Sequence, residues 1–223
     1  MKKILVLIII LISSNVLAHM DHYIKYTKIE MDIFRNGKLI GYNYYFFTRK
    51  GDETIVTNQI KFSVKILGTT IFQVEGYGEE KYNKDKLISY ESKTLQNDKE
   101  KFVNLVFDKN KFNVKGSSFS GEASINNIVG NWWNHKILQT DSQISPISGS
   151  IKKQVVTFVG KEKIEQYGKV YNVDRFTLKS KDMTLPKDKR LDFNIWYDQE
   201  NFQIIRISYN RMGNWEYRLK NFE

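Results

Sequence analysis

Turn-forming residues recur about every ten to fifteen residues along this chain and separate stretches rich in Ile, Val, Phe, Tyr and Thr. Asn36-Gly37 is the clearest of these turns, because Asn-Gly readily adopts the positive φ angles that a two-residue hairpin requires. Stretches of this kind between short turns are typical of antiparallel strands. The chain is therefore predicted to be all-β, a single antiparallel meander of about 10–12 strands.

Several of the predicted strands alternate cleanly between apolar and polar residues. Ile29, Met31 and Ile33 share one face of the first strand, and charged residues occupy the other face. Residues 215–220 repeat the pattern near the end of the chain. Alternation with period two indicates one buried face and one solvated face. Residues 39–48 differ, since they carry aromatic residues on both faces and need cover on each.

A sheet of this many strands must curl to dispose of its edges, so we expect a closed or half-open barrel, with a two-sheet sandwich as the second choice. The interior wall is expected to come from large aromatic side chains: Tyr42, Tyr44, Phe46, Phe62, Phe72, Phe102, Trp196 and Trp215.

The regular spacing of strands and turns is interrupted between Gly116 and Gly149, where small polar residues predominate. One long loop or short helix is expected near 117–149, with Ser124 as the N-cap of a helix that ends near Gly130. A connection of this length is where a lid or a plug would originate.

The first eighteen residues have the pattern of a secretory signal peptide. A basic start, Lys2-Lys3, precedes an apolar run over residues 4–12, and small residues favour cleavage after Ala18. The apolar run is shorter than the about 20 residues that span a bilayer, so we expect removal and not anchoring. The exported chain, residues 19–223, is then expected to form a single β-barrel-like domain with no transmembrane segment.

Export normally permits disulfides, yet the chain has no cysteine, so its stability must come from a packed core. The same absence excludes acylation at a lipobox cysteine. We expect a periplasmic location, with an extracellular one as the second choice. The exported part is basic: 33 Lys and Arg, the 35 of the whole chain less Lys2 and Lys3, face 25 Asp and Glu. Either anionic envelope components or simple solvation explains this excess.

The candidate ligand-binding residues are aromatic. Trp132, Trp133 and His135 lie together in the long connection, and Tyr44 and Trp196 stand on strands. Tryptophan offers a large apolar face with one hydrogen-bond donor, which suits a ligand pocket. The alternative is that one tryptophan plugs the barrel mouth while His135 caps a backbone carbonyl.

Catalytic and metal sites find little support. The chain has no Gly-x-Ser-x-Gly motif and no thiol, and its three histidines do not have ligand spacing. We therefore expect no catalytic residues, no metal and no cofactor. Basic and aromatic residues interleave over residues 206–218, but export and the core-face alternation argue against a nucleic-acid partner.

Eight short segments, in this order, resemble the exported bacterial family called domain of unknown function 6134: Phe34–Gly41, Val64–Gly68, Glu79–Tyr82, Lys86–Thr94, Asn131–Asn134, Ile147–Gly149, Ile195–Asp198 and Gly213–Leu219. The resemblance covers nearly all of residues 19–223 and implies a β-rich protein without an assigned activity. More distantly, the chain is similar to periplasmic half-barrels of lipocalin-like or lipoprotein-carrier-like shape, which implies an apolar cavity.

Three classes of function stay open. The first is an exported protein that binds a lipid or another apolar small molecule in a barrel cavity. The second is a structural or interaction module with a solid core that binds an envelope protein partner. The least favoured is a hydrolase with an unrecognised site.

Overall fold

The computed structural model describes Tyr23 and residues 25–223, so the signal sequence predicted at residues 1–18 and its cleavage site at Ala18 lie outside the described residues. Within them the fold is nearly all β, as predicted, and fifteen strands form one sheet. The first eight strands are β1 (Lys28–Arg35), β2 (Lys38–Lys50), β3 (Glu53–Ile66), β4 (Thr69–Asn83), β5 (Lys86–Gln96), β6 (Lys99–Asp108), β7 (Lys111–Gly116) and β8 (Ser120–Ser124). The other seven are β9 (Ile128–Val129), β10 (Ser142–Ile144), β11 (Ile151–Gln166), β12 (Lys169–Ser180), β13 (Asp192–Asp198), β14 (Ile204–Asn210) and β15 (Asn214–Phe222).

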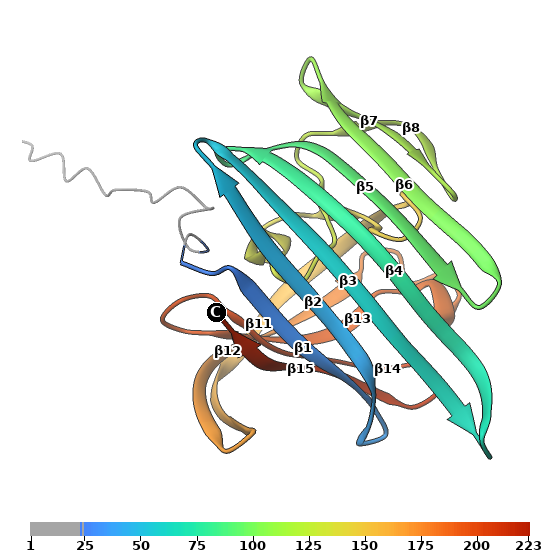
Figure 1. The fold of residues 1–223 in the computed structure, drawn as a ribbon, viewed down its shortest axis with the longest axis vertical. Coiled ribbons are helices and arrows are strands. Elements are labelled where there is room, and N and C mark those ends of the chain that lie inside the picture. The colour runs from blue at the N-terminus through green and yellow to red at the C-terminus, as the bar shows by residue number, and fades with distance from the viewer. Residues whose placement is uncertain (1–22, 24) are drawn as a thin grey trace, which may run out of the picture.

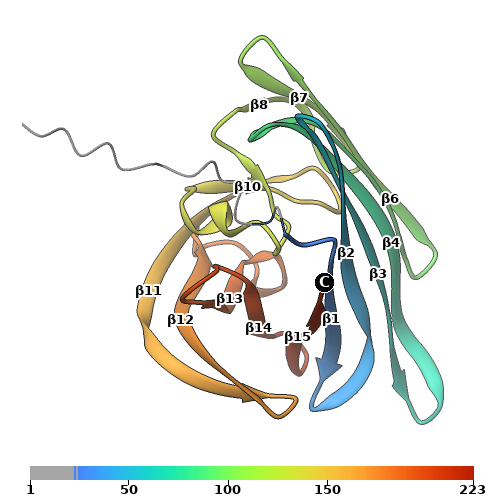
Figure 2. The same cartoon turned by 60° about the vertical axis from the view of Figure 1, so that its left-hand side comes forward.

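The sheet is a curled meander that does not close. Each strand from β1 to β8 and from β10 to β15 pairs with its neighbours in sequence, and β1 also pairs with β15. The free ends of the sheet are therefore β8 and β9, which are joined only by the chain at residues 125–127. Figure 2 shows the resulting half-barrel, in which β11 and β12 lie opposite the strands β2–β6. Of the two barrel forms predicted, the half-open one is confirmed.

Fifteen strands are more than the sequence predicted, because the connection near 117–149 contains the short strands β8, β9 and β10. The helix predicted from Ser124 to Gly130 is wrong. Ile128 and Val129 instead pair in parallel with Gln143 and Ile144 of β10. The helical turn of this region is the 3₁₀ helix η2 (His135–Leu138), where the Asn134 side chain accepts a hydrogen bond from the Lys136 backbone N–H.

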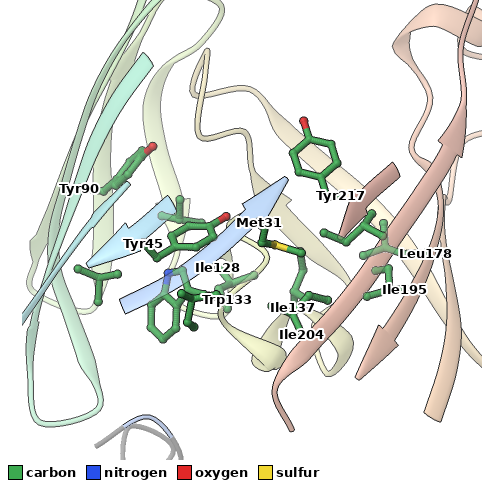
Figure 3. Close-up of a cluster of buried hydrophobic side chains, with 14 of the residues drawn as sticks. Met31, Tyr45, Tyr90, Ile128, Trp133, Ile137, Leu178, Ile195, Ile204 and Tyr217 are labelled. Carbon is green, nitrogen blue, oxygen red and sulfur yellow. The ribbon is translucent and has the colours of Figure 1, made fainter. Parts of the chain in front are cut away.

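The part of the connection from Ile128 to Gly149, here called the inner segment, lies inside the curl of the sheet. Its Trp133, Ile137 and Ile144 are fully buried. Figure 3 shows Trp133 and Ile137 between Tyr45 of β2 on one side and Leu178 and Ile195 of the opposite wall. The core of the half-barrel is thus formed by the sheet and the inner segment together.

The face predicted for β2 is wrong. Asn43, Tyr45 and Phe47 are buried on its inner face, whereas Tyr42 and Tyr44 stack on each other on the outer face with ring centroids 4.5 Å apart. Because both faces of β2 are aromatic, alternation alone does not distinguish them. Contact with the inner segment identifies the inner face of β2, since the Trp132 backbone N–H donates to the Tyr45 hydroxyl at 3.4 Å.

Most hairpins turn through residues with positive φ. Asn36 (φ 50°) and Gly37 (φ 76°) form the predicted two-residue turn between β1 and β2. Leu67-Gly68 and Tyr167-Gly168 adopt nearly the same pairs of φ angles in the β3–β4 and β11–β12 turns. Glycine accepts this conformation at no cost, but a bulky side chain does so with strain. The turns therefore share one backbone geometry and differ in the side chain they present.

Candidate functional site

The structure divides the five residues predicted to bind a ligand between the two faces of the sheet. Trp132, Trp133 and His135 lie together on the inner segment. Tyr44 stacks on Tyr42 on the outer face. Trp196 also lies on the outer side, where its Nε1–H donates to the Glu162 carboxylate at 2.6 Å. No single site therefore contains all five.

Trp133 is held by a buried carboxylate. Glu80, on the inner face of β4, is only 1% exposed. Its Oε1 accepts hydrogen bonds from the Trp133 Nε1–H at 2.8 Å and from the Asn131 side-chain amide at 2.7 Å, and its Oε2 accepts from the Tyr82 hydroxyl at 2.5 Å. These contacts tie the inner segment to the wall of the half-barrel.

Burial raises the pKa of Glu80 above its ordinary value, although the three donated hydrogen bonds favour the carboxylate and act in the opposite direction. Burial, together with the nearby Glu80 charge, also raises the pKa of Tyr82 well above its usual range. A carboxyl enclosed in this way has its acceptor positions occupied by the protein. We therefore interpret it as a structural anchor of the inner segment.

His135 is enclosed as well. Its Nδ1 lies 2.7 Å from the hydroxyl of Tyr23, which also accepts from the His135 backbone N–H at 3.1 Å. Phe202 stacks on the imidazole with centroids 5.1 Å apart. Burial raises the pKa of Tyr23, so its hydroxyl stays protonated. The histidine thus packs against a buried tyrosine and an aromatic ring.

Trp132 borders a small pocket between the inner segment and strands β2 to β5. This pocket measures about 100 Å³ and is lined by tyrosine hydroxyls and amides, among them Tyr45, Tyr90 and Asn131. Ligand sites for drug-sized molecules span about 300–1,000 Å³. The space at Trp132 is therefore too small for the lipid-sized cavity that the barrel shape led us to expect.

A larger pocket of about 650 Å³ lies at one end of the half-barrel and opens to solvent. We call it the mouth pocket. Four segments line it: the β4–β5 hairpin at residues 82–87, the β6–β7 hairpin at 107–112, the β8–β9 connection at 125–128, and residues 134–140 around η2. In Figure 1 both hairpins turn at the upper end of the sheet.

The mouth pocket combines an apolar lining with cations. Leu87, Phe107, Phe112 and Ile128 contribute the apolar part. Lys84, Lys86 and Lys136 contribute three ammonium groups against the single carboxylate of Asp85. Lys86 is fixed, because its Nζ lies 3.5 Å from the centre of the Phe107 ring, a cation–π contact.

The mouth pocket and the buried Glu80 share a wall. Tyr82 and Asn134 line the pocket and join each other through a long hydrogen bond of 3.4 Å from the Asn134 amide to the Tyr82 hydroxyl. The same hydroxyl donates to Glu80. Whatever holds the inner segment in place therefore also shapes the pocket.

Sequence reasoning missed Glu80, Lys86 and Phe107. For Glu80 a signal was present, because alternation along β4 places it on the same face as the apolar residues Val74 and Tyr82. A lone acid on an apolar face is an expensive exception that needs partners. No comparable pattern marks the mouth pocket, since its four segments meet only through the curl of the sheet.

Comparisons with known proteins bear on the fold. The model of the family described as domain of unknown function (DUF6134) matches residues 31–220. The crystal structure of a beta-barrel-like protein of domain of unknown function DUF1849 from Brucella abortus has a TM-score of 0.61 at 10% identity, covering 88% of this chain and 96% of that one. At such low identity the likeness concerns the fold alone. A DUF1329 family protein from Desulfovibrio piger gives a TM-score of only 0.25 at 12% identity, covering 92% of this chain and 88% of that one. No curated protein matches the sequence.

Two features of the described residues bear on other classes of site. None of the helices there is long and apolar enough to cross a bilayer. Nor does that part of the chain bring three or more His, Cys, Asp or Glu residues together as ligands for a metal.

Proposed function

The chain belongs to the DUF6134 family, a domain of unknown function, and we propose that it is an exported envelope protein that binds an amphipathic molecule with an anionic group in the mouth pocket. Export rests on the signal-peptide pattern of residues 1–18. We place the mature protein in the periplasm.

The observation that carries this proposal is the mouth pocket itself. Its volume of about 650 Å³ lies within the range usual for small-molecule sites. An apolar lining offers a place for a hydrocarbon or ring system. Lys84 already pairs with Asp52 at 3.6 Å. Lys86 and Lys136 favour an anionic group, because a counter-charge offsets the hydration that an ammonium loses when it is partly enclosed.

The location differs from the interior cavity expected from the sequence, because Trp133 and the rest of the inner segment occupy the interior. A ligand in the mouth pocket would contact the inner segment at residues 134–140 and the sheet at both hairpins. Binding there does not require the core to open.

Titration with 1-anilinonaphthalene-8-sulfonate tests the proposal, because this probe has an apolar ring system and one sulfonate. We expect saturable binding, displaced by laurate. The double variant K86A/K136A should weaken binding about tenfold, since two ammonium groups near the sulfonate are lost. The matched control K161A/K163A removes two exposed lysines from β11 and should leave the affinity unchanged. Equal affinities in the two double variants would contradict the proposal.

Export is tested separately by the intact mass of protein recovered from the periplasmic fraction. A mass that begins at His19 supports cleavage after Ala18. A chain that keeps residues 1–18 and stays in the cytoplasm would contradict export while leaving the pocket proposal standing.

The second candidate is a structural or protein-interaction module of the envelope, and the filled interior of the half-barrel favours it. It predicts that crosslinking in cells captures one envelope protein and that the anionic probe binds without dependence on Lys86 and Lys136.

A further inference from the structure

One end of the half-barrel, opposite the mouth pocket, is formed by four connections: residues 35–39, 65–71, 181–191 and 210–214. We call them the rim. Antiparallel pairing brings them to the same end, since Arg35 at the end of β1 faces Trp215 at the start of β15. Arg211 also donates a hydrogen bond to the Arg190 carbonyl oxygen, which joins two of the four connections. Figure 1 shows the β1–β2 and β3–β4 turns together at the lower edge of the molecule.

Each rim connection exposes a large apolar side chain. Leu67 is 100% exposed, Met212 85%, Leu39 60% and Met183 57%. They come from four different connections, and the β3–β4 connection exposes two more beside Leu67, Ile66 at 51% and Ile71 at 48%. Single exposed apolar residues are ordinary on protein surfaces, but four at one end that also carries the basic excess described below are not explained by chance exposure alone.

The turn geometry makes the presence of Leu and Met at positions 67 and 212 unusual. Leu67 has φ 49° and Met212 has φ 51°, values that disfavour bulky side chains and favour Asn or Gly. Asn36, at the same end, is the residue that such a turn prefers. Tyr167 has the same conformation in the β11–β12 turn, but its hydroxyl donates to the Asp32 carboxylate of β1 at 2.8 Å, which explains its presence. Burial in the fold provides no such reason for Leu67.

The β3–β4 hairpin carries Leu67 beyond its neighbours. Pairing of β2 with β3 reaches only to Phe62, and pairing of β4 with β5 begins only at Val74. Residues 63–72 therefore stand past the paired parts of both neighbours, with Leu67 at the tip (Figure 1). A projecting tip meets a flat surface before the rest of the sheet does.

Charge separates the two ends of the half-barrel. The rim connections hold eight Lys or Arg residues and two Asp residues. Four hairpin connections at the opposite end, residues 49–53, 83–86, 108–111 and 198–203, hold six basic and six acidic residues. Within the described part of the chain, none of the eight rim cations belongs to an ion pair. The rim thus has a strong excess of unneutralised positive charge.

We propose that the rim docks on a lipid bilayer with anionic headgroups, with Leu67 and Met212 inserted among the acyl chains and the rim cations at the headgroups. Separate apolar side chains set among Lys and Arg suit an interface in which each tip enters lipid independently. A protein partner would instead be met by a continuous apolar patch. This surface is distinct from the mouth pocket and does not depend on what that pocket binds.

Co-sedimentation with vesicles tests the proposal, using protein whose intact mass shows that residues 1–18 are absent. The protein should bind phosphatidylglycerol–phosphatidylethanolamine vesicles and bind neutral phosphatidylcholine vesicles much more weakly. The double variant L67N/M212N should weaken binding about tenfold or more, because two apolar insertions are lost. The variant K38S/K65S should weaken it about fivefold for each charge removed.

The design separates docking from folding. Asn suits the turn conformation of Leu67 and Met212, so L67N/M212N should fold at least as well as the wild type. The control V106T/V159T trims two exposed apolar side chains away from the rim, one on β6 and one on β11, and should bind vesicles like the wild type. Failure of the wild-type protein to bind anionic vesicles, or undiminished binding by L67N/M212N, would overturn the proposal.

Discussion

Two hairpin turns of the half-barrel share one backbone geometry but differ in what their first side chain contacts. Leu67-Gly68 at the rim and Tyr167-Gly168 in the β11–β12 turn have matching positive φ angles. Tyr167 donates a hydrogen bond to Asp32 of β1, whereas Leu67 projects fully into solvent. The backbone sets the turn but does not require an apolar side chain in it. The fold therefore accounts for Tyr167 and does not account for Leu67.

The inner segment fills the space inside the curled sheet and so separates the mouth pocket from the rim. Trp133 and the Glu80 carboxylate hold it there, and Asn134 extends the contact to the mouth pocket. Weakening the contact between Trp133 and Glu80 should therefore disturb the mouth pocket more than the rim.

The largest effect is expected for W133A. Removing the fully buried indole leaves a cavity and deprives Glu80 of one hydrogen-bond donor. The free energy of unfolding should therefore fall by about 3–5 kcal/mol. Urea unfolding measures this loss. W133F is the matched control, since it keeps an aromatic ring and removes the indole N–H. A W133A protein as stable as the wild type would show that the inner segment does not anchor the fold.

A pH effect is expected at Glu80. Burial raises its pKa in the folded protein above the ordinary value of 4.5, so between these two values the folded protein binds more protons than the unfolded chain. Stability then falls as pH rises through that window. E80Q does not titrate and lacks this fall.

The stability difference between E80Q and the wild type should therefore shift in favour of E80Q as pH rises above 4.5. Urea unfolding at a series of pH values checks this. A difference that stays constant with pH would mean that the Glu80 pKa is the same in the folded and unfolded states.

A smaller effect is expected for Y167F in the β11–β12 turn. The variant removes the donor to Asp32 and leaves that carboxylate, which is itself mostly buried, without this partner. A loss of about 1 kcal/mol in the free energy of unfolding is expected. Thermal or urea unfolding measures it, and an unchanged stability would remove the structural reason given for Tyr167.

The smallest effect is expected for L67N, the rim counterpart of Y167F. Asn tolerates positive φ better than Leu, and Leu67 buries nothing, so stability should stay equal or rise by less than about 1 kcal/mol. A clear destabilisation by L67N would mean that Leu67 stabilises the fold after all, and the contrast between the two turns would lose its basis.

Much of the fold was readable from local patterns. Alternation predicted the buried face of β1, where Ile29, Met31 and Ile33 are fully buried, and Asn36-Gly37 predicted its hairpin. The inner face of β2 was not readable, because aromatic residues occupy both sides of the strand. The strands β9 and β10 of the inner segment were missed because they are only 2 and 3 residues long, too short to show an alternating pattern.

The candidate site was predicted only in part. Trp132, Trp133 and His135 were correctly placed together on the long connection, but nothing local linked them to Glu80. The mouth pocket depends on four distant connections that meet through the curl of the sheet, which no spacing in the sequence encodes. Leu67-Gly68 was visible as a turn, yet its meaning depends on the exposure of Leu67 and on its neighbours at the rim.

The central claim is that an anionic amphiphile binds in the mouth pocket at the end away from the rim. Amide chemical-shift mapping by NMR, with laurate added below its micelle concentration, tests this most directly. The account predicts shifts concentrated at residues 84–87, 107–112, 125–128 and 134–140, which reduce in K86A/K136A. Shifts centred on the rim at residues 65–71 and 210–214, or no localised shifts at all, would contradict it.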